Sequence, residues 1–383
     1  MQRSMLKPIG GPLGYNYNLA TQLEAKGVKN IHYMMTSQGD YTKLNKKISQ
    51  LKIGWLRNFL VIIKSIIRKY KRLYGWHHKS IVNLDDYDIV HFHSTADMFE
   101  CRDSLKDYKG KVVLTSHSPT VLWKEQFDML TPWEKKHMSW FYKKLERMDE
   151  YAFTRADYIV FPCKEAEEPY YNNWDKYERL HNLKANQYRY LVTGINDCYA
   201  KQTREDIRSK YGIPEDSFVF VYVGRHNELK GYDLLKKIGG EVLKDENVWF
   251  LIAGVESPLK GINHPRWIEI GWTDDPYSII SASDLFVLPN RETYFDLIML
   301  EILALGQLVL ASYTGGNKYF DKFGCSGIFT YQDLNEAVDK AKFIMKLDNT
   351  ERKRLQKLNR EIYENNFTSS IFADNYVKMI SSL

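Results

Sequence analysis

The chain has 383 residues, a length typical of two or three domains. Hydrophobic residues make up 44% and charged residues 27%, which excludes the disordered and fibrous classes. The longest apolar uncharged run, 302–311, is far shorter than the ~18 residues of a membrane span, and residues 1–7 lack the apolar core of a secretory signal. The 4 cysteines are too widely spaced for a disulfide framework or a zinc site, so we expect a cytoplasmic protein.

Positive charge is concentrated in one segment. The net charge is +6, yet residues 41–84 contain no Asp or Glu, and the rest of the chain is net negative. Apolar residues from Leu56 to Leu73 recur there at helical spacing with basic residues between them. Such a helix either packs its apolar stripe into the core or lies in the headgroups of an anionic membrane, and the two interpretations are evenly balanced. The candidate membrane contacts are Trp55, Arg57, Lys64, Arg68, Lys69, Lys71 and Arg72. No nucleic-acid-binding motif is recognisable, so we expect no nucleic-acid partner.

In chain order, short β-rich runs alternate with helical patterns. In the first half, the pattern predicts strands over 31–35, 88–93, 111–116, 158–161 and 189–193, and helices over 14–25, 51–73, 132–155 and 165–177. In the second half it predicts strands over 218–223, 248–253, 267–270, 285–288 and 308–311, with helices over 204–211, 232–243, 276–281, 297–305, 334–346, 349–365 and 371–382. This alternation is typical of an α/β protein with parallel sheets covered on both faces.

A weak internal echo suggests two such sheets in series. Residues 156–162 resemble residues 283–289, with an Asp before each apolar run. We therefore expect two Rossmann-like doubly wound domains, over 1–196 and 197–367. Residues 368–383 are expected to form a helix that packs back on the first domain.

The residues that follow the predicted strands are the candidates for ligand binding, because ligands of doubly wound sheets bind at the carboxyl ends of the strands. The segment from Gly224 to Gly231 follows one strand and opens a helix. Its two cations, Arg225 and Lys230, could bind a diphosphate, or they could be solvated side chains of an ordinary turn. Glu301 lies in an otherwise apolar helix, where a carboxylate is costly unless it is paired or borders a site, for example facing a ribose diol. Thr314-Gly315-Gly316-Asn317 follows a further strand and is either a close-approach loop or a turn.

Two features of the first half are further candidates for a ligand-binding or polar site. Gly10 to Gly14 precedes the first helix but lacks the dinucleotide pattern, so we expect no nicotinamide cofactor, although something bulky could approach Gly11 and Gly14. His93 and His117 end or follow successive strands; each alone is more often structural, but two together favour a polar site.

Taken together, the motifs resemble the retaining glycosyltransferases of family 4, which have the GT-B fold of two domains facing each other across a cleft. The resemblance extends from residue 10 to about residue 367 and is specific in the second half. It is carried by Tyr222-Val223-Gly224-Arg225 through Lys230-Gly231, by Ile270-Gly271-Trp272, and by residues 283–289 leading to Phe295 and Glu301.

The resemblance implies a role for each matching residue. Arg225 and Lys230 would bind the donor diphosphate, Glu301 the nucleotide ribose, and His117 would lie near the transferred sugar. The remaining donor-binding candidates are Gly11, Gly14, Thr293, Phe295, Asp296, Leu297, Gly315 and Gly316.

The chain departs from the family pattern at two positions. The family's first Glu precedes the second by eight residues, and Thr293 occupies that position here, with Glu292 one residue earlier. Asp296 stands where the family usually has Gly. Either Glu292 reaches the sugar through a shifted loop or Thr293 replaces it, so Glu292 remains a catalytic candidate.

The resulting hypothesis is a retaining hexosyltransferase that moves a sugar from a nucleotide-diphosphate donor to an acceptor hydroxyl. It requires no metal and no cofactor besides the donor, since cations can stabilise the leaving diphosphate. The basic helix suggests a lipid-linked glycan acceptor in bacterial surface polysaccharide assembly, and a protein peripheral at the inner face of the cell membrane. The alternatives are an inactive sugar-nucleotide-binding partner subunit and a sugar-nucleotide epimerase.

Overall fold

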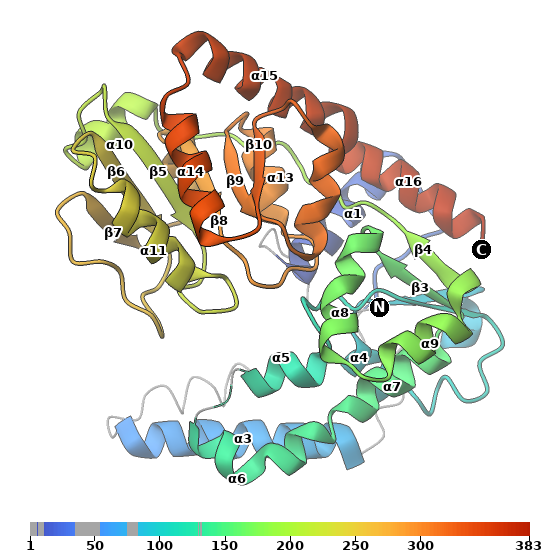
Figure 1. Ribbon diagram of the computed structural model, residues 1–383. Coiled ribbons are helices and arrows are strands. Elements are labelled where there is room, and N and C mark those ends of the chain that lie inside the picture. Colours follow the sequence, from blue (N-terminus) through green and yellow to red (C-terminus); the bar gives the residue numbers. More distant parts are fainter. Residues whose placement is uncertain (1–5, 7–10, 35–53, 75–82, 129, 131) are drawn as a thin grey trace. The chain divides into compact units, whose positions relative to one another are not determined.

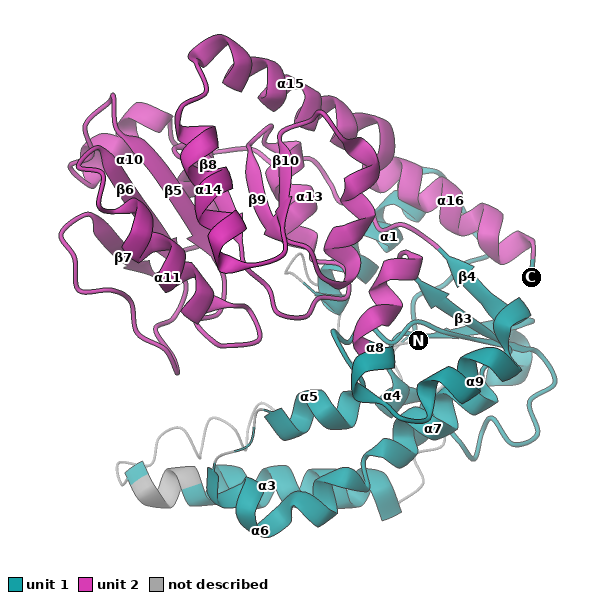
Figure 2. Cartoon of the chain, in the orientation of Figure 1, with its two compact units in different colours: residues 1–161, 170–190, 383 teal, residues 162–169, 191–382 magenta. Residues whose placement is uncertain are grey.

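The computed structural model describes residues 6, 11–34, 54–74, 83–128, 130 and 132–383 (Figure 1). The chain divides into two compact units, residues 1–161, 170–190 and 383, and residues 162–169 and 191–382 (Figure 2). The expected boundary after residue 196 lies shortly beyond the break after Tyr190. Helix α16 (Ser369–Ser381) groups with the second unit, and its packing on the first domain stays a prediction.

The first unit is built on a parallel sheet with strand order β1-β2-β3-β4. Its strands are short and apolar, and β1 to β3 are almost entirely buried, as parallel strands covered on both faces are. The strands are β1 (Ile89–Phe92), β2 (Lys111–Leu114), β3 (Tyr158–Phe161) and β4 (Tyr188–Tyr190). The helices are α1 (Pro12–Ala25), α3 (Gly54–Tyr74), α4 (Thr95–Glu100), α5 (Leu122–Asp128), α6 (Pro132–Lys143), α7 (Glu146–Arg155), α8 (Glu168–Asn173) and α9 (Tyr177–Leu183).

Three predictions for this unit are wrong or incomplete. The described residues 31–34 form no strand, and none of them is buried, which a strand inside a parallel sheet would be. The helix expected over 132–155 is two helices, α6 and α7, separated by Lys144 and Leu145. The helix expected over 165–177 is likewise divided, because a 3-10 turn and α8 precede α9.

The second unit contains a parallel sheet with strand order β10-β9-β8-β5-β6-β7. The chain runs outward from β5 to β7 and then returns to β8 beside β5, so the sheet is doubly wound and its switch point lies between β5 and β8. The strands are β5 (Phe218–Val223), β6 (Val248–Ala253), β7 (Trp267–Gly271), β8 (Leu285–Leu288), β9 (Val309–Ser312) and β10 (Ile328–Tyr331). The helices are α10 (Arg204–Lys210), α11 (Tyr232–Val242), α12 (Pro276–Ser281), α13 (Leu297–Ala304), α14 (Leu334–Met345), α15 (Asn349–Asn366) and α16.

The expected elements of this unit agree with the observed ones to within about two residues. Two elements were missed: the edge strand β10, which is only partly buried, and the 3-10 helix η4 (Gly315–Phe323). The main core lies between the sheet and helices α11 and α14, where the rings of Phe220 and Phe250 stack at a centroid distance of 4.8 Å.

The internal echo has a structural cause. Asp157 and Asp284 each precede a strand and accept a hydrogen bond from the first residues of the neighbouring strand. The carboxylate of Asp157 accepts from the Val112 N–H at 2.8 Å, and that of Asp284 from the Val219 N–H at 2.8 Å. Each Asp therefore supplies an acceptor for a strand N–H at the amino end of its sheet, where the ladder ends.

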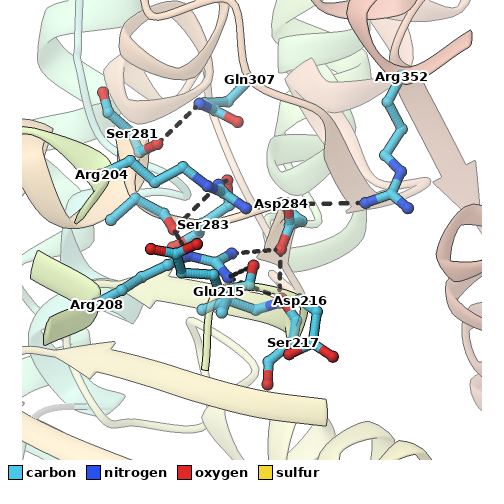
Figure 3. A network of polar contacts seen from close by, with 12 residues as sticks. Arg204, Arg208, Glu215, Asp216, Ser217, Ser281, Ser283, Asp284, Gln307 and Arg352 are labelled. Atoms are coloured by element: carbon cyan, nitrogen blue, oxygen red, sulfur yellow. Dashed lines mark hydrogen bonds and ion pairs between the residues drawn. The ribbon is translucent and has the colours of Figure 1, made fainter. Parts of the chain in front are cut away.

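Asp284 is also the centre of an ion-pair network in the second unit (Figure 3). Arg204 and Arg208 each donate to one Asp284 oxygen, at 2.7 and 2.8 Å, and Arg352 lies 3.8 Å away. Arg208 is only 2% exposed and also donates to the carbonyl oxygens of Ala282, Pro214, Glu215 and Ser217. A buried guanidinium is tolerated because these acceptors replace its water.

Candidate functional site

Two loops meet at the switch point of the second sheet. The loop 224–231 follows β5 and the loop 289–296 follows β8. Gly231 has φ 66°, and a Cβ at this position would overlap the carbonyl oxygen of Pro289. Glycine is therefore required at 231, both for its left-handed backbone and for the close approach of the two loops.

Lys230 joins the two loops. Its Nζ lies 2.8 and 2.7 Å from the two carboxylate oxygens of Asp296, and both side chains are about one-fifth exposed. The predicted diphosphate ligand Lys230 is thus paired with the residue that departs from the family pattern. An ammonium has three N–H donors, so this contact leaves one for a ligand.

Asp296 is held in its ionised form. Burial alone would raise the pKa of Asp296, but the Lys230 ammonium and the hydrogen bond from Asn290 Nδ2 hold that pKa below its usual range. Asp296 stands at the N-cap of α13, yet its side chain makes no capping bond. Its carboxylate is therefore directed to Lys230 instead of its own helix.

Glu301 lies in the second turn of α13. Burial, and then the negative charge of Asp296, raise the pKa of Glu301 to about 7, while a hydrogen bond with Tyr277 opposes the shift. This carboxyl therefore holds its proton to a higher pH than an exposed Glu does. The sequence signal, a lone carboxylate in an apolar helix, correctly marked a group with an unusual environment.

The other predicted donor ligands of these loops differ in exposure. The Arg225 guanidinium is exposed and makes no ion pair with the described part of the chain. Thr293 is fully buried, whereas Glu292 is partly exposed. Phe295 is buried and its ring stacks on Phe320 of η4 at 5.4 Å, so its contacts are with the core of the unit. Leu297 begins α13 and is partly exposed.

A third loop packs on the second. Gly315, at the start of η4, has φ 44°, and a Cβ there would overlap the carbonyl oxygen of Thr293. Gly316 donates its N–H to the same carbonyl at 3.2 Å. The N–H of Gly315 donates to Glu168 Oε1 at 3.3 Å, and Lys318 forms an ion pair with the same carboxylate.

In the first unit, the structure brings the predicted histidines together. His93 Nδ1 lies 2.9 Å from His117 Nε2, at the carboxyl ends of β1 and β2. The His91 ring is tilted against that of His93 at a centroid distance of 4.2 Å, and His91 bonds to Thr115. The Tyr15 ring lies 4.4 Å from that of His117. Burial lowers the pKa of His117 to about 3, so its imidazole is neutral at physiological pH.

The glycine-rich segment is partly helical. Gly11 is the N-cap of α1 with φ 74°, which favours glycine, and Pro12 opens the helix. Gly14 is buried in the first turn of α1 and is not part of a loop, because the helix begins two residues before the expected start. Gly10 lies outside the described residues.

The candidate membrane contacts require a correction. Lys69 is 9% exposed and bonds to Ser65 at 2.9 Å, and Arg72 forms an ion pair with Glu100 at 2.6 Å. These two cations therefore serve the packing of the first unit. Lys64 is partly exposed, and Arg68 and Lys71 are exposed, while the side chains of Trp55 and Arg57 lie outside the described part. Within the described residues, no helix combines the length and apolarity that a bilayer crossing requires.

The site contains residues that the sequence did not single out. Asn290 donates a hydrogen bond to Asp296, and Tyr277 forms a hydrogen bond with Glu301. Lys318 of η4 forms an ion pair with Glu168. Only Asn290 carried a local signal, since it directly follows Pro289 at the end of a buried strand. Among the described residues, no group of three or more His, Cys, Asp or Glu is arranged to hold a metal ion.

Two family models match the chain, and together they cover most of it. The model described as glycosyl transferases group 1 matches residues 203–362, and the model described as Glycosyltransferase Family 4 matches residues 9–181. The lipopolysaccharide core biosynthesis glycosyltransferase LpsE of Rhizobium meliloti is 26% identical over 46% of this chain and 53% of its own. The O-antigen biosynthesis glycosyltransferase WclY of Escherichia coli is 25% identical over 50% of this chain and 55% of its own. The chain spans about half the length of the curated relatives it matches.

Solved structures match along the whole chain. Sucrose-phosphate synthase from Thermosynechococcus elongatus has a TM-score of 0.63 at 17% identity, covering 100% of this chain and 94% of that one. HepE from Anabaena, solved in complex with UDP, has a TM-score of 0.62 at 14% identity, covering 100% and 99%. At these identities the likeness establishes the fold, and both units have the α/β architecture of these proteins.

Proposed function

Since the chain belongs to the GT-B glycosyltransferases, we propose that it transfers a sugar from a nucleotide-diphosphate donor to an acceptor hydroxyl. The observation that carries this proposal is the meeting of Lys230, Asp296 and Glu301 at the switch point of the second sheet. Ligands of doubly wound sheets bind at such points. A cation beside a carboxyl group suits the phosphate and ribose of one nucleotide.

The proposed chemistry follows from the charge that develops on the donor. Breaking the bond between the sugar and the phosphate leaves a negatively charged diphosphate, which Arg225 and the third N–H of Lys230 would stabilise. The leaving phosphate oxygen would accept the proton of the attacking hydroxyl, with retention at the anomeric carbon. Glu301 would bind the ribose through its carboxylate oxygens. We propose that the two cations make a metal unnecessary.

The donor and acceptor are proposed from the relatives. Because HepE was solved with UDP and with UDP-glucose, a UDP-sugar is the first donor to test. LpsE and WclY act in lipopolysaccharide core and O-antigen biosynthesis, which supports a lipid-linked glycan acceptor in bacterial surface polysaccharide assembly. Such an acceptor would place the protein at the inner face of the cell membrane.

The test is a thermal-shift screen of the full chain against UDP-, GDP- and ADP-sugars. We expect one nucleotide class to raise Tm, because a ligand that binds only the folded state stabilises it. Product analysis with the selected donor, with and without EDTA, then measures transfer or donor hydrolysis. No shift with any nucleotide sugar would contradict the proposal, and activity abolished by EDTA would contradict its metal-independent form.

A second candidate is a sugar-nucleotide-binding subunit without transfer activity. It is favoured by the burial of Thr293 at the position of the family's first Glu, and by the neutralisation of Lys230 by Asp296. Donor binding without any transfer or hydrolysis would support this candidate. Release of nucleoside diphosphate from the donor would exclude it.

We expect the affinity for the nucleotide sugar to increase as the pH rises through about 7. The pKa of Glu301 is raised to about 7, and its ionised form accepts hydroxyl hydrogen bonds better than its protonated form. The donor's diphosphate is a diester that does not titrate in this range, so the change reports on the protein. Calorimetric titration between about pH 6 and about pH 8 measures the effect, and Glu301→Gln should remove it. An equal slope in the variant would contradict the assignment of Glu301.

The raised pKa of Glu301 affects the stability of the fold in the opposite direction to its effect on nucleotide-sugar affinity. The folded chain holds the Glu301 proton at a pH where the unfolded chain has lost it, so this group lowers the stability as the pH rises from about 4.5 to about 7. Tighter binding across the same upper range is therefore not a consequence of a more stable fold.

A further inference from the structure

Helices α3 and α6 lie side by side in the first unit (Figure 1). They are joined by a small core in which Leu73 is buried and Ile66 partly buried on α3, facing Phe141 and Tyr142 of α6. Lys69 points into the same contact, with its Nζ 4.7 Å from the centre of the Tyr142 ring. Burial, and then the nearby Arg68, lower the pKa of Lys69 to about 8. One stripe of α3 is therefore used by the fold.

The apolar stripe of α3 is wider than this contact. Large side chains beside it remain about half exposed: Phe59 53%, Ile67 48%, Tyr70 57% and Tyr74 44%. Helix α6 adds Trp133, 58% exposed, and Trp140, 60% exposed, seven residues apart and hence on one face of the helix. Isolated exposed apolar residues are ordinary, but a group of this size on two neighbouring helices indicates an interaction surface.

The exposed aromatic groups of the two helices lie on a common face. The Nζ of Lys144 is 4.9 Å from the Trp140 ring of α6 and 5.9 Å from the Tyr74 ring of α3. Tyr70 and Tyr74 are themselves 4.9 Å apart between ring centroids. One ammonium thus bridges the exposed rings of α3 and α6.

The charge of this face has one sign. Helix α3 contains no acidic residue, and the single acid of α6, Glu134, is 6% exposed beside Tyr142. The exposed charges of α6 and the residue after it are all positive: Lys135, Lys136, Lys143 and Lys144. Aromatic rings among lysines, with no exposed carboxylate on α3 or α6, match the interface of an anionic bilayer, where rings lie at headgroup depth and ammonium groups meet phosphate.

We propose that α3 and α6 together form a bilayer-contact surface for anionic phospholipid, in which Trp133, Trp140, Tyr70 and Tyr74 enter the headgroup region. The sequence pointed to α3 alone; the structure adds α6 as an equal partner and removes Lys69 and Arg72 from the contact. This surface deepens the proposed function by naming the membrane contact of a transferase with a lipid-linked acceptor. Its test does not require transferase activity.

The test is flotation of the full chain with vesicles of phosphatidylcholine, with or without phosphatidylglycerol. We expect flotation only with the anionic vesicles, and loss of flotation at high salt. Trp133→Ser with Trp140→Ser should reduce the bound fraction roughly tenfold, and Lys136→Glu with Lys143→Glu by a similar or larger factor. The bound fraction and Tm are measured for each variant, so that unfolding is recognised.

Matched controls lie in the second unit. Trp272→Ser removes an indole that is 75% exposed, and Lys237→Glu with Lys353→Glu reverses two exposed cations. Both should float like the unchanged protein. Absence of flotation of the unchanged protein, or equal losses in the controls, would overturn the proposal. A shift from dimer to monomer in the tryptophan variant, without vesicle binding, would also overturn it and assign the face to a second copy of the chain. The nucleotide-induced Tm shift is measured on the same samples, so a failure of donor binding is recognised separately.

Discussion

Replacing Lys230 with Ala is expected to lower the rate of sugar transfer by about 10²–10³-fold, while the fold is retained. The ammonium of Lys230 lies at the switch point of the second sheet, fixed by two contacts of 2.8 and 2.7 Å to Asp296. In the proposed reaction its remaining N–H meets the charge that develops on the leaving diphosphate. Initial rates at saturating donor, with thermal unfolding as the check on folding, measure the effect.

Two further variants make this test specific. Lys237→Ala removes an exposed ammonium from α11 and should leave the rate unchanged. Asp296→Gly introduces the residue usual in the family and frees the charge of Lys230, so nucleoside diphosphate should bind more tightly, because a phosphate no longer competes with a carboxylate. An unchanged rate in Lys230→Ala would remove Lys230 from the mechanism.

Replacing Asp284 with Ala is expected to lower the free energy of unfolding of the second unit by about 3–5 kcal/mol. Arg208 is 2% exposed and would keep its charge without a counter-ion, and the Val219 N–H would lose its acceptor. Bonds from Arg208 to carbonyl oxygens remain, but they do not neutralise the charge. Asp284 and Val219 lie at the amino ends of β8 and β5, whereas the candidate-site loops follow the carboxyl ends of these strands, so the loss should be one of stability.

Urea denaturation of the full chain measures this change. The matched control is Glu241→Ala, which breaks an exposed ion pair with Lys244 and should leave the transition where it is, since exposed pairs contribute little. If Asp284→Ala shifted the transition no more than this control, the buried network would not be a determinant of stability.

Part of the candidate site could be predicted from local patterns. Lys230 and Glu301 were identified because each lies beside a buried strand or inside an apolar helix, where a charged group is unusual. Asp296 was also named as a candidate, but the pairing of these residues with their partners could not be predicted in the same way. Asp296 is 66 residues from Lys230, and Tyr277 lies on a different helix from Glu301. Such contacts depend on how the sheet orders its strands, since β8 returns to lie beside β5.

The α/β class and most elements of the second unit could be predicted from the sequence, because buried parallel strands appear as short apolar runs and the helices between them as periodic patterns. The sequence also located the basic amphipathic helix α3. Packing showed which cations of α3 contact the rest of the first unit, and that α6 shares the exposed face of α3. Composition and spacing describe one helix at a time, whereas the pairing of Arg72 with Glu100, and the burial of Lys69 against Tyr142, follow from packing between distant segments.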